Sequence, residues 1–189
     1  MQCLREGTRQ AHMRIEGALT LLSPRLSKAE YLRVLEAFYG FYAELEPRIA
    51  AEAGEHRDAL KLEIRGKLAL LALDLGGLGR RVDQIDALPR CTSVPEIRTA
   101  SQALGALYVL EGATLGGQVI ARSLQAVLGI SATSGAAFFN GYGGETRPMW
   151  KSFCDYVDRA PGIETDMAVA TAIDTFETLR VWLGAAGHS

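Results

Sequence analysis

The sequence has few cysteines, few prolines and no excess of charge of one sign. Its 189 residues include three cysteines and six prolines, and 20 Lys and Arg residues nearly balance 22 Asp and Glu residues. A net charge of −2 leaves no basic excess with which to bind nucleic acid or an anionic membrane surface. The 48% of residues that are hydrophobic are enough to build a continuous core. We therefore expect a folded domain whose partner is not a polyanion.

The scarcity of cysteine also excludes two kinds of site. Cys3, Cys91 and Cys154 are an odd number at wide spacings, and no Cys-x-x-Cys pair is present to hold zinc or to act as a redox dithiol.

No segment approaches the roughly 18 uninterrupted apolar residues of a membrane-spanning helix. The N-terminal segment lacks the apolar stretch of a signal peptide. These absences predict reduced thiols in a cytoplasmic protein that does not enter a membrane.

Apolar residues recur at helical spacing along most of the chain, which predicts an all-α fold. Ser27 and Glu30 have the spacing of a capping box, while Ser93 and Gly129 are candidates for the cap and the stop of the longest helix. No linker or repeat divides the sequence, so we expect one helical bundle over residues 1–189. The expected helices are residues 2–19, 27–52, 59–75, 95–128, 148–159 and 164–183, with a surface connection at 80–90 and a loop or short irregular helix at 131–144.

The longest predicted helix contains interior glycines, each of which costs a helix about 1 kcal/mol relative to alanine. Their spacing places Gly105, Gly112 and Gly116 on one face, and the adjacent pair Gly116 and Gly117 predicts a kink. A face without side chains allows something flat to approach the backbone. It equally allows a second helix to pack closely, and the pattern alone leaves both interpretations open.

His12 is the histidine best placed to bind a metal, because it lies within an amphipathic helix. His56 follows a glycine break in a charged stretch, and His188 lies near the C-terminus. Glu16, one turn after His12, is able to hold one ring nitrogen while the other binds a metal. A structural His–Glu pair is the alternative. Neither Glu-x-x-His nor His-Glu-x-x-His occurs, so a metal on His12 would need most of its ligands from a cofactor such as haem.

A third cluster combines aromatic residues and glycines after the longest helix. It begins at Phe138 and Phe139 and continues to Trp150, Lys151 and Phe153. Aromatic side chains beside glycines wall an apolar slot or fill a junction between helices. Lys151 is a charge within an apolar run, and it either extends to solvent or neutralises an anionic group of a ligand.

Taken together, three segments resemble the haem oxygenase family: LREGTRQAHMRIE, LEGATLGGQVI and FFNGYGGETRPMWKSF. The resemblance implies that His12 is the proximal iron ligand and that Glu16 is its hydrogen-bond partner. It also implies that haem lies between the N-terminal helix and a kinked distal helix. Gly112, Gly116 and Gly117 would then pack over the distal haem face and take part in catalysis.

The same resemblance assigns further contacts to haem. Arg5, Arg9 and Lys151 match basic positions near the haem edge, where they would bind the propionates. Phe139 belongs to the family's paired phenylalanines. The weaker C-terminal match AIDTFETLRVWL places Phe176 in the wall of the pocket.

The function implied by the resemblance is oxidative opening of the haem ring, in which haem is both substrate and oxygen-activating cofactor. The expected products are biliverdin, carbon monoxide and ferrous iron, with O₂ as co-substrate and electrons from a ferredoxin- or flavin-type reductase. The segment YVLEGATLGG is most similar to the proteobacterial branch that makes biliverdin beside bacteriophytochromes. A bacteriophytochrome is therefore the expected biliverdin acceptor.

One position departs from the family pattern. Well-studied members place an aspartate after the first distal glycine, where it anchors a chain of water molecules, and this sequence has Ala113 there. Alanine cannot hydrogen-bond to water. Either another group organises the water, or the protein is a non-catalytic haem-binding or sensory protein. A helical small-molecule pocket without iron, as in thiaminase-like bundles, is a third possibility.

Overall fold

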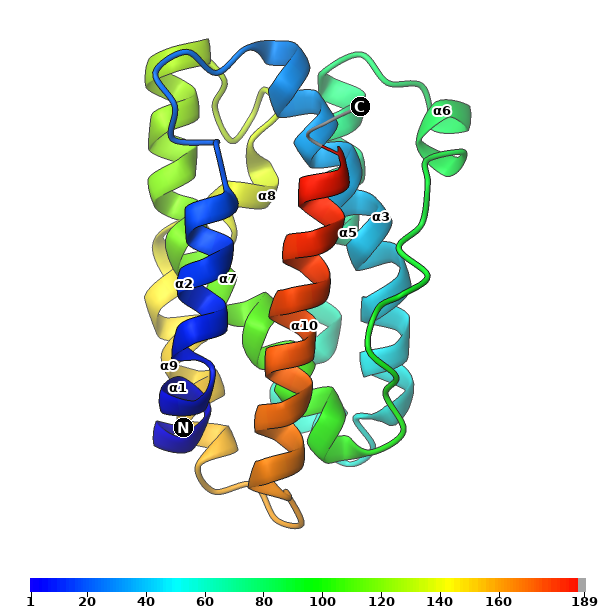
Figure 1. The fold of residues 1–189 in the computed structure, drawn as a ribbon, viewed down its shortest axis with the longest axis vertical. Helices are drawn as coiled ribbons and strands as arrows, with labels where there is room; N and C mark the ends of the chain where they lie inside the picture. The colour runs from blue at the N-terminus through cyan, green and yellow to red at the C-terminus, as the bar shows by residue number, and fades with distance from the viewer. Residues whose placement is uncertain (187–189) are drawn as a thin grey trace.

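The computed structural model describes residues 1–186, and every regular element within them is helical. This confirms the all-α fold, while His188 lies outside the described residues. Figure 1 shows the longer helices running roughly along the long axis of the molecule. The elements are α1 (Gln2–Gly7), α2 (Arg9–Ala18), α3 (Lys28–Glu52), α4 (His56–Leu60), η1 (Leu62–Ile64), α5 (Leu68–Gly77), α6 (Val82–Asp86), α7 (Ala100–Leu128), α8 (Ala137–Asn140), η2 (Gly143–Glu145), α9 (Thr146–Val157) and α10 (Thr165–Ala186).

Helix α7 is at the centre of the packing. It contacts α10, α3, α8 and α9, and Figure 1 shows it passing behind α10 and changing direction along its length. The helix is continuous through Gly116 and Gly117. It is long and apolar enough to cross a membrane, but more than half of its apolar window is buried inside the protein. We therefore interpret it as the core helix of the bundle.

The first predicted helix is divided in two at Thr8. The Thr8 hydroxyl donates a hydrogen bond to the Leu4 carbonyl over 2.7 Å, and Thr8 takes φ −91° and ψ −5°. Backbone hydrogen bonds still join Thr8 to Leu4 and His12 to Thr8. Helices α1 and α2 therefore form a nearly continuous rod, and residues on both share its faces.

The capping box at the start of α3 is confirmed. The Glu30 amide donates to Ser27 Oγ over 3.2 Å, and the Ser27 amide donates to Glu30 Oε2 over 2.7 Å. The hydrogen bonds from Ser27 lower the pKa of the Glu30 carboxyl. The helix ends at Glu52, as predicted.

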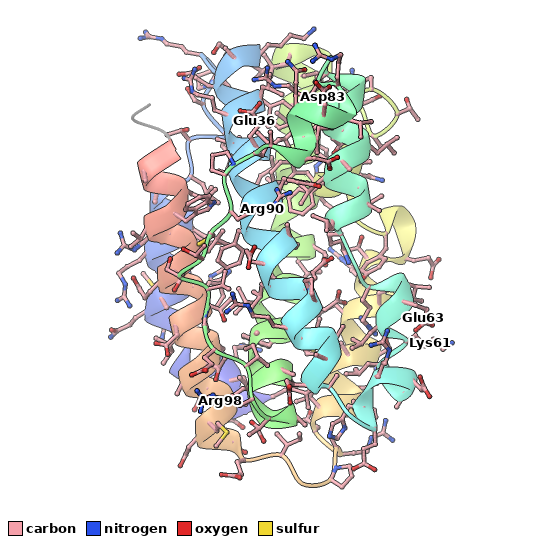
Figure 2. The ribbon with its side chains drawn as sticks, turned by 90° about the vertical axis from the view of Figure 1, so that its right-hand side faces the viewer. Glu36, Lys61, Glu63, Asp83, Arg90 and Arg98 are labelled. Carbon is pink, nitrogen blue, oxygen red and sulfur yellow. The ribbon has the colours of Figure 1, made fainter. Side chains whose placement is uncertain are left out.

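The predicted helix at residues 59–75 is wrong, because the chain breaks into α4, η1 and α5. Lys61 adopts the left-handed conformation with φ +53°, and Figure 2 shows Lys61 and Glu63 at this break. After the break, the Glu46 carboxylate of α3 accepts hydrogen bonds from the amides of Lys67 (2.6 Å) and Leu68 (3.3 Å). A carboxylate from another helix thus caps α5, and no local sequence signal specifies it.

The predicted start of the longest helix is also wrong. Helix α7 begins at Ala100 with Thr99, not Ser93, as its cap, and the Gln102 amide donates to Thr99 Oγ1 over 3.3 Å. Residues 88–99 instead run down the molecule beside α3 and α10, with Arg90 and Arg98 along this segment (Figure 2). Gly129, with φ +69°, ends α7 as predicted.

The two segments expected to be irregular both contain short helices. Residues 80–90 include α6, and residues 131–144 include α8 and the start of η2. Gly141 at the end of α8 has φ +57° and ψ −118°, a conformation that side chains disfavour. The chain therefore reverses sharply there and presents Phe138 and Phe139 to the interior, where both are buried.

Candidate active site

A pocket of about 450 Å³ separates α2 from α7. Helix α2 packs along α10, and the two lie side by side in Figure 1. The pocket lies between α2 and the glycine-rich half of α7. The exposed atoms of the lining are mostly apolar. Seven of the predicted site residues line this pocket: His12, Glu16, Gly112, Gly116, Gly117, Phe139 and Phe176.

His12 lies on the α2 wall of the pocket with about half of its side chain exposed. Its Nδ1 atom is 3.5 Å from Glu16 Oε2, which is ion-pair range rather than a well-formed hydrogen bond. The His12 ring contacts Phe176 edge-on, with ring centroids 5.5 Å apart. Since Nδ1 faces Glu16, Nε2 is the ring nitrogen left for a ligand in the pocket.

An ion pair joins α2, the helix that carries His12, to α10. Arg14 Nε donates to Glu177 Oε1 over 2.6 Å, and Arg180 Nε donates to the other carboxylate oxygen over 3.0 Å. These hydrogen bonds, Arg14 first, lower the pKa of the Glu177 carboxyl. The ion pair and the His12–Phe176 contact therefore both join α2 to α10.

The glycines of α7 have different environments although they share a helix. A Cβ atom at Gly116 would meet no atom within 4 Å, and one at Gly112 would make an ordinary contact of 3.6 Å with the Trp150 ring. At Gly117 it would lie 2.7 Å from the Phe139 carbonyl oxygen, and at Gly105 it would lie 2.2 Å from that of Ala168. Gly105 and Gly117 thus allow close backbone packing, while Gly116 borders open space.

Asp74, which the sequence analysis missed, holds the two phenylalanines in place. Its carboxylate accepts hydrogen bonds from the amides of Ala137 and Phe138, both over 2.8 Å. The side chain is buried, and burial raises the pKa of the Asp74 carboxyl against the lowering effect of the two amides. A single carboxylate within the apolar run LALLALDLGG was the sequence signal for such a role.

The three predicted basic residues do not line the pocket. Arg5 and Arg9 are exposed on the rod that carries His12, and neither forms an ion pair with the part of the chain that the structure describes. Lys151 is exposed on α9 and pairs with Asp155 one turn later. Its neighbour Trp150 does line the pocket. All three cations are therefore outside the apolar cavity.

A buried ionic cluster, also missed from the sequence, lies beside α7. Glu111 is 1% exposed and forms ion pairs with Arg65 and Lys67. The Tyr142 hydroxyl donates to Glu111 Oε1 over 2.6 Å. Lys67 reaches the pocket wall, whereas Glu111 does not. Glu111 within the apolar stretch LYVLEGAT was the sequence signal, since a buried carboxylate needs cationic partners.

Comparison with protein families decides what kind of pocket this is. The family model described as heme oxygenase matches residues 1–185. The chain belongs to the haem oxygenase family.

Two solved haem oxygenases share its fold. The haem oxygenase of Leptospira interrogans matches with a TM-score of 0.77 and 18% identity, over 97% of this chain and 98% of that one. Haem oxygenase-1 of the cyanobacterium Synechocystis, in complex with haem, matches with a TM-score of 0.76 and 16% identity, over 96% and 89% of the two chains. At these identities the matches show the fold alone. A comparison with curated proteins finds no match.

The pocket of this haem oxygenase has the features that haem requires. One wall carries a histidine, the α7 wall has open backbone at Gly116, and the space between them is mostly apolar. Within residues 1–186 no three His, Cys, Asp or Glu side chains group together as metal ligands. An iron at His12 would therefore take its other ligands from the porphyrin, as haem iron does.

Proposed function

We propose that this haem oxygenase cleaves haem to biliverdin, carbon monoxide and ferrous iron, using O₂ and an external reductant. Membership of the family supports haem as the substrate. The observation that carries the proposal is the position of His12 on α2, across the pocket from open backbone at Gly116 on α7. Haem supplies the iron that activates O₂ and the ring edge that is oxidised.

His12 holds the iron through Nε2 in this proposal. Glu16, whose Oε2 lies 3.5 Å from Nδ1, orients the ring so that Nε2 is left for the iron. The Phe176 ring limits rotation of His12 from the α10 side. A neutral imidazole donates less electron density than a thiolate, so it does not favour cleavage of the O–O bond in the way a thiolate does.

Gly112 and Gly116 form the distal surface and act by shape. Because Gly116 carries no side chain, the α7 backbone itself limits the space above the haem face. Gly117 contributes differently, since its close contact with the Phe139 carbonyl holds α8 against α7. The limited space at Gly116 would restrict the angle of bound O₂ and so direct oxidation to one meso carbon.

Arg5, Arg9 and Lys151 bind the haem propionates at the pocket edge. Arg5 and Arg9 have no ion-pair partner within residues 1–186 that would compete for them. Lys151 would exchange its exposed pairing with Asp155 for a propionate. These contacts fix the in-plane rotation of haem, while burial of the large ring supplies most of the binding energy.

The partners follow from the chemistry and from the family branch. The reaction consumes electrons, so a ferredoxin- or flavin-type reductase is the proposed donor. A bacteriophytochrome is the proposed acceptor of biliverdin, on the similarity of YVLEGATLGG to that branch. We infer a cytoplasmic location, which the burial of the apolar helix α7 inside the bundle supports.

Ala113 favours a second candidate, a haem-binding or sensory protein that does not turn over. It lines the pocket where an aspartate would anchor water. Incubating the protein with hemin, O₂ and a reductase system separates the two functions. The proposed function predicts decay of the Soret band and biliverdin on chromatography. A stable Soret band with no biliverdin would identify the second candidate.

A further inference from the structure

Lys67 is a buried lysine in the wall of the haem pocket. It lies between η1 and α5 and is 2% exposed, yet it lines the pocket together with Ala113 and the α7 glycines. Arg65 of the same ionic cluster and Glu46, the cap of α5, instead border a separate hollow of about 240 Å³. Lys67 is therefore the member of this cluster, among the described residues, that brings a positive charge to the haem side.

The Lys67 ammonium group has one hydrogen that its protein partners hold only loosely. It donates to the Arg65 carbonyl and, over 2.7 Å, to the Tyr142 hydroxyl. Its third contact, with Glu111 Oε1, is 3.4 Å long, beyond the usual range of a hydrogen bond to nitrogen. An ammonium has three N–H groups, and two of them have acceptors at hydrogen-bond distance. A water molecule in the pocket can therefore compete with Glu111 for the third N–H.

The charges around Lys67 keep it in place. Glu111 of α7 forms ion pairs with Lys67 and Arg65, and Glu46 of α3 acts on Lys67 at longer range. Burial lowers the pKa of Lys67, and Glu111 followed by Glu46 counteracts the shift. The Tyr142 ring adds a contact, with Nζ 4.1 Å from its centroid.

A second polar group lines the pocket and, like Lys67, interacts electrostatically with Glu46 and Glu111. Tyr42 of α3 is 1% exposed and lines the pocket, and its hydroxyl has no hydrogen-bond partner within the described residues. Burial, with Glu46 and Glu111, raises the pKa of Tyr42, so the hydroxyl is neutral and available as a donor. A polar end in an otherwise apolar pocket is suited to water.

We propose that Lys67 is the positioning residue that orients water over the distal haem face, where Ala113 offers no polar side chain. This inference rests on the proposed function. The group that holds water above the haem is then the Lys67 ammonium, which Glu111 and Tyr142 hold in place, and not a carboxylate on α7. A cation there stabilises negative charge that develops next to it.

The test measures the pH midpoint at which water on the ferric iron of the hemin complex ionises, followed by absorbance. A positive charge nearby favours the hydroxide form, so Lys67→Met should raise this midpoint by about one unit. The affinity for azide, an anion, should fall roughly tenfold. Hemin affinity should change less than about threefold, because the apolar ring surface is untouched.

Arg65→Met is the matched control. It removes the same charge from the same Glu111 carboxylate, but Arg65 does not line the pocket. Arg65→Met should lower the thermal stability of the apo-protein. It should shift the pH midpoint of the iron-bound water by less than half of the shift in Lys67→Met. Lys67→Gln removes the charge with a polar replacement and serves if the Met variant fails to fold. Lys67→Arg retains the charge and should restore the wild-type midpoint.

Suppose that Lys67→Met and Lys67→Gln bind hemin with an unchanged midpoint, while the wild-type protein turns hemin over. That result would overturn the role of Lys67 and leave the proposed function in place. An equal shift in Arg65→Met would assign the effect to the cluster as a whole and would also overturn it. Failure of the wild-type protein to bind hemin would instead overturn the proposed function. The raised midpoint in both Lys67→Met and Lys67→Gln, reversed in Lys67→Arg, is the supporting result.

Discussion

Gly105 lies directly against the backbone of Ala168, where a Cβ atom would be 2.2 Å from the carbonyl oxygen. This contact joins α7 to α10, the helix that also carries Phe176 and supports α2. Eleven residues further along α7, a Cβ atom at Gly116 would meet nothing within 4 Å. Glycines on one helix face therefore serve two purposes, which substitution distinguishes.

Gly116→Ala should leave the apo-protein at least as stable as the wild type, because the added methyl has space and alanine favours the helix by up to about 1 kcal/mol. Hemin turnover should fall or yield a different biliverdin isomer, since the methyl group enters the space above the haem. Thermal unfolding without hemin and product chromatography after turnover measure the two effects.

Gly105→Ala is the matched control. The methyl group there would separate α7 from α10, at a cost of about 1–3 kcal/mol or more from overpacking. Its turnover per folded molecule should remain near that of the wild type. A large loss of apo stability in Gly116→Ala, equal to that in Gly105→Ala, would show that both glycines serve packing.

Asp74→Ala should loosen α8 and thereby the Phe138–Phe139 wall of the pocket. The buried amide of Phe138 and the partly buried amide of Ala137 would lose their acceptor, which costs about 1–3 kcal/mol for a fully buried group. Asp74→Asn retains one acceptor oxygen and should lose less. In chemical denaturation, the free energy of unfolding should fall in the order wild type, Asp74→Asn, Asp74→Ala. An Asp74→Ala variant as stable as the wild type would contradict the role of Asp74.

Glu177→Gln tests the ion pair that joins α10 to α2. The folded-state pKa of Glu177 lies below its ordinary value of 4.5, so its contribution is present above that pH and is lost as pH falls through the lowered pKa. Because the pair is partly exposed, we expect a loss of at most about 1 kcal/mol at pH 7. The difference between the proteins in urea unfolding should shrink below pH 4.5. A difference that stays constant down to pH 2 would exclude the ion pair as its source.

Neutralising Arg5, Arg9 or Lys151 should change the ratio of biliverdin isomers more than it changes hemin affinity. The exposed cations touch the ligand edge in this account, so each single Met variant should lower affinity only a few-fold. Arg98→Met, an exposed change on the segment beside α10 (Figure 2), is the control. An isomer ratio unchanged in all three variants would remove these residues from the steering role.

Local signals predicted the elements that depend on local chemistry. The Ser27–Glu30 capping box and the stop at Gly129 were predicted because cap and helix lie within a few residues of each other. The break after Lys61 was not predicted. It depends on Glu46, which caps α5 from another helix, and that contact forms only when the chain is folded.

The candidate site shows the same division. Helical spacing grouped His12 with Glu16 and, separately, the α7 glycines, because it specifies a shared face within one helix. Only the resemblance to the haem oxygenase family predicted that the two groups line one pocket, as they do. The spacing did not distinguish Gly105 from Gly116, since the difference lies in the neighbouring helix. Lys67 was also missed, because a lysine in a charged stretch gives no sign that it is buried.

The absorbance spectrum of ferric hemin bound to the wild-type protein and to His12→Ala tests directly whether His12 holds the haem iron. We expect a 1:1 six-coordinate complex for the wild type. The variant should bind hemin with an altered Soret band, and added imidazole should restore the wild-type spectrum, because the free ligand replaces the missing side chain. The same six-coordinate spectrum in His12→Ala without imidazole, or no hemin complex with the wild type, would contradict the account.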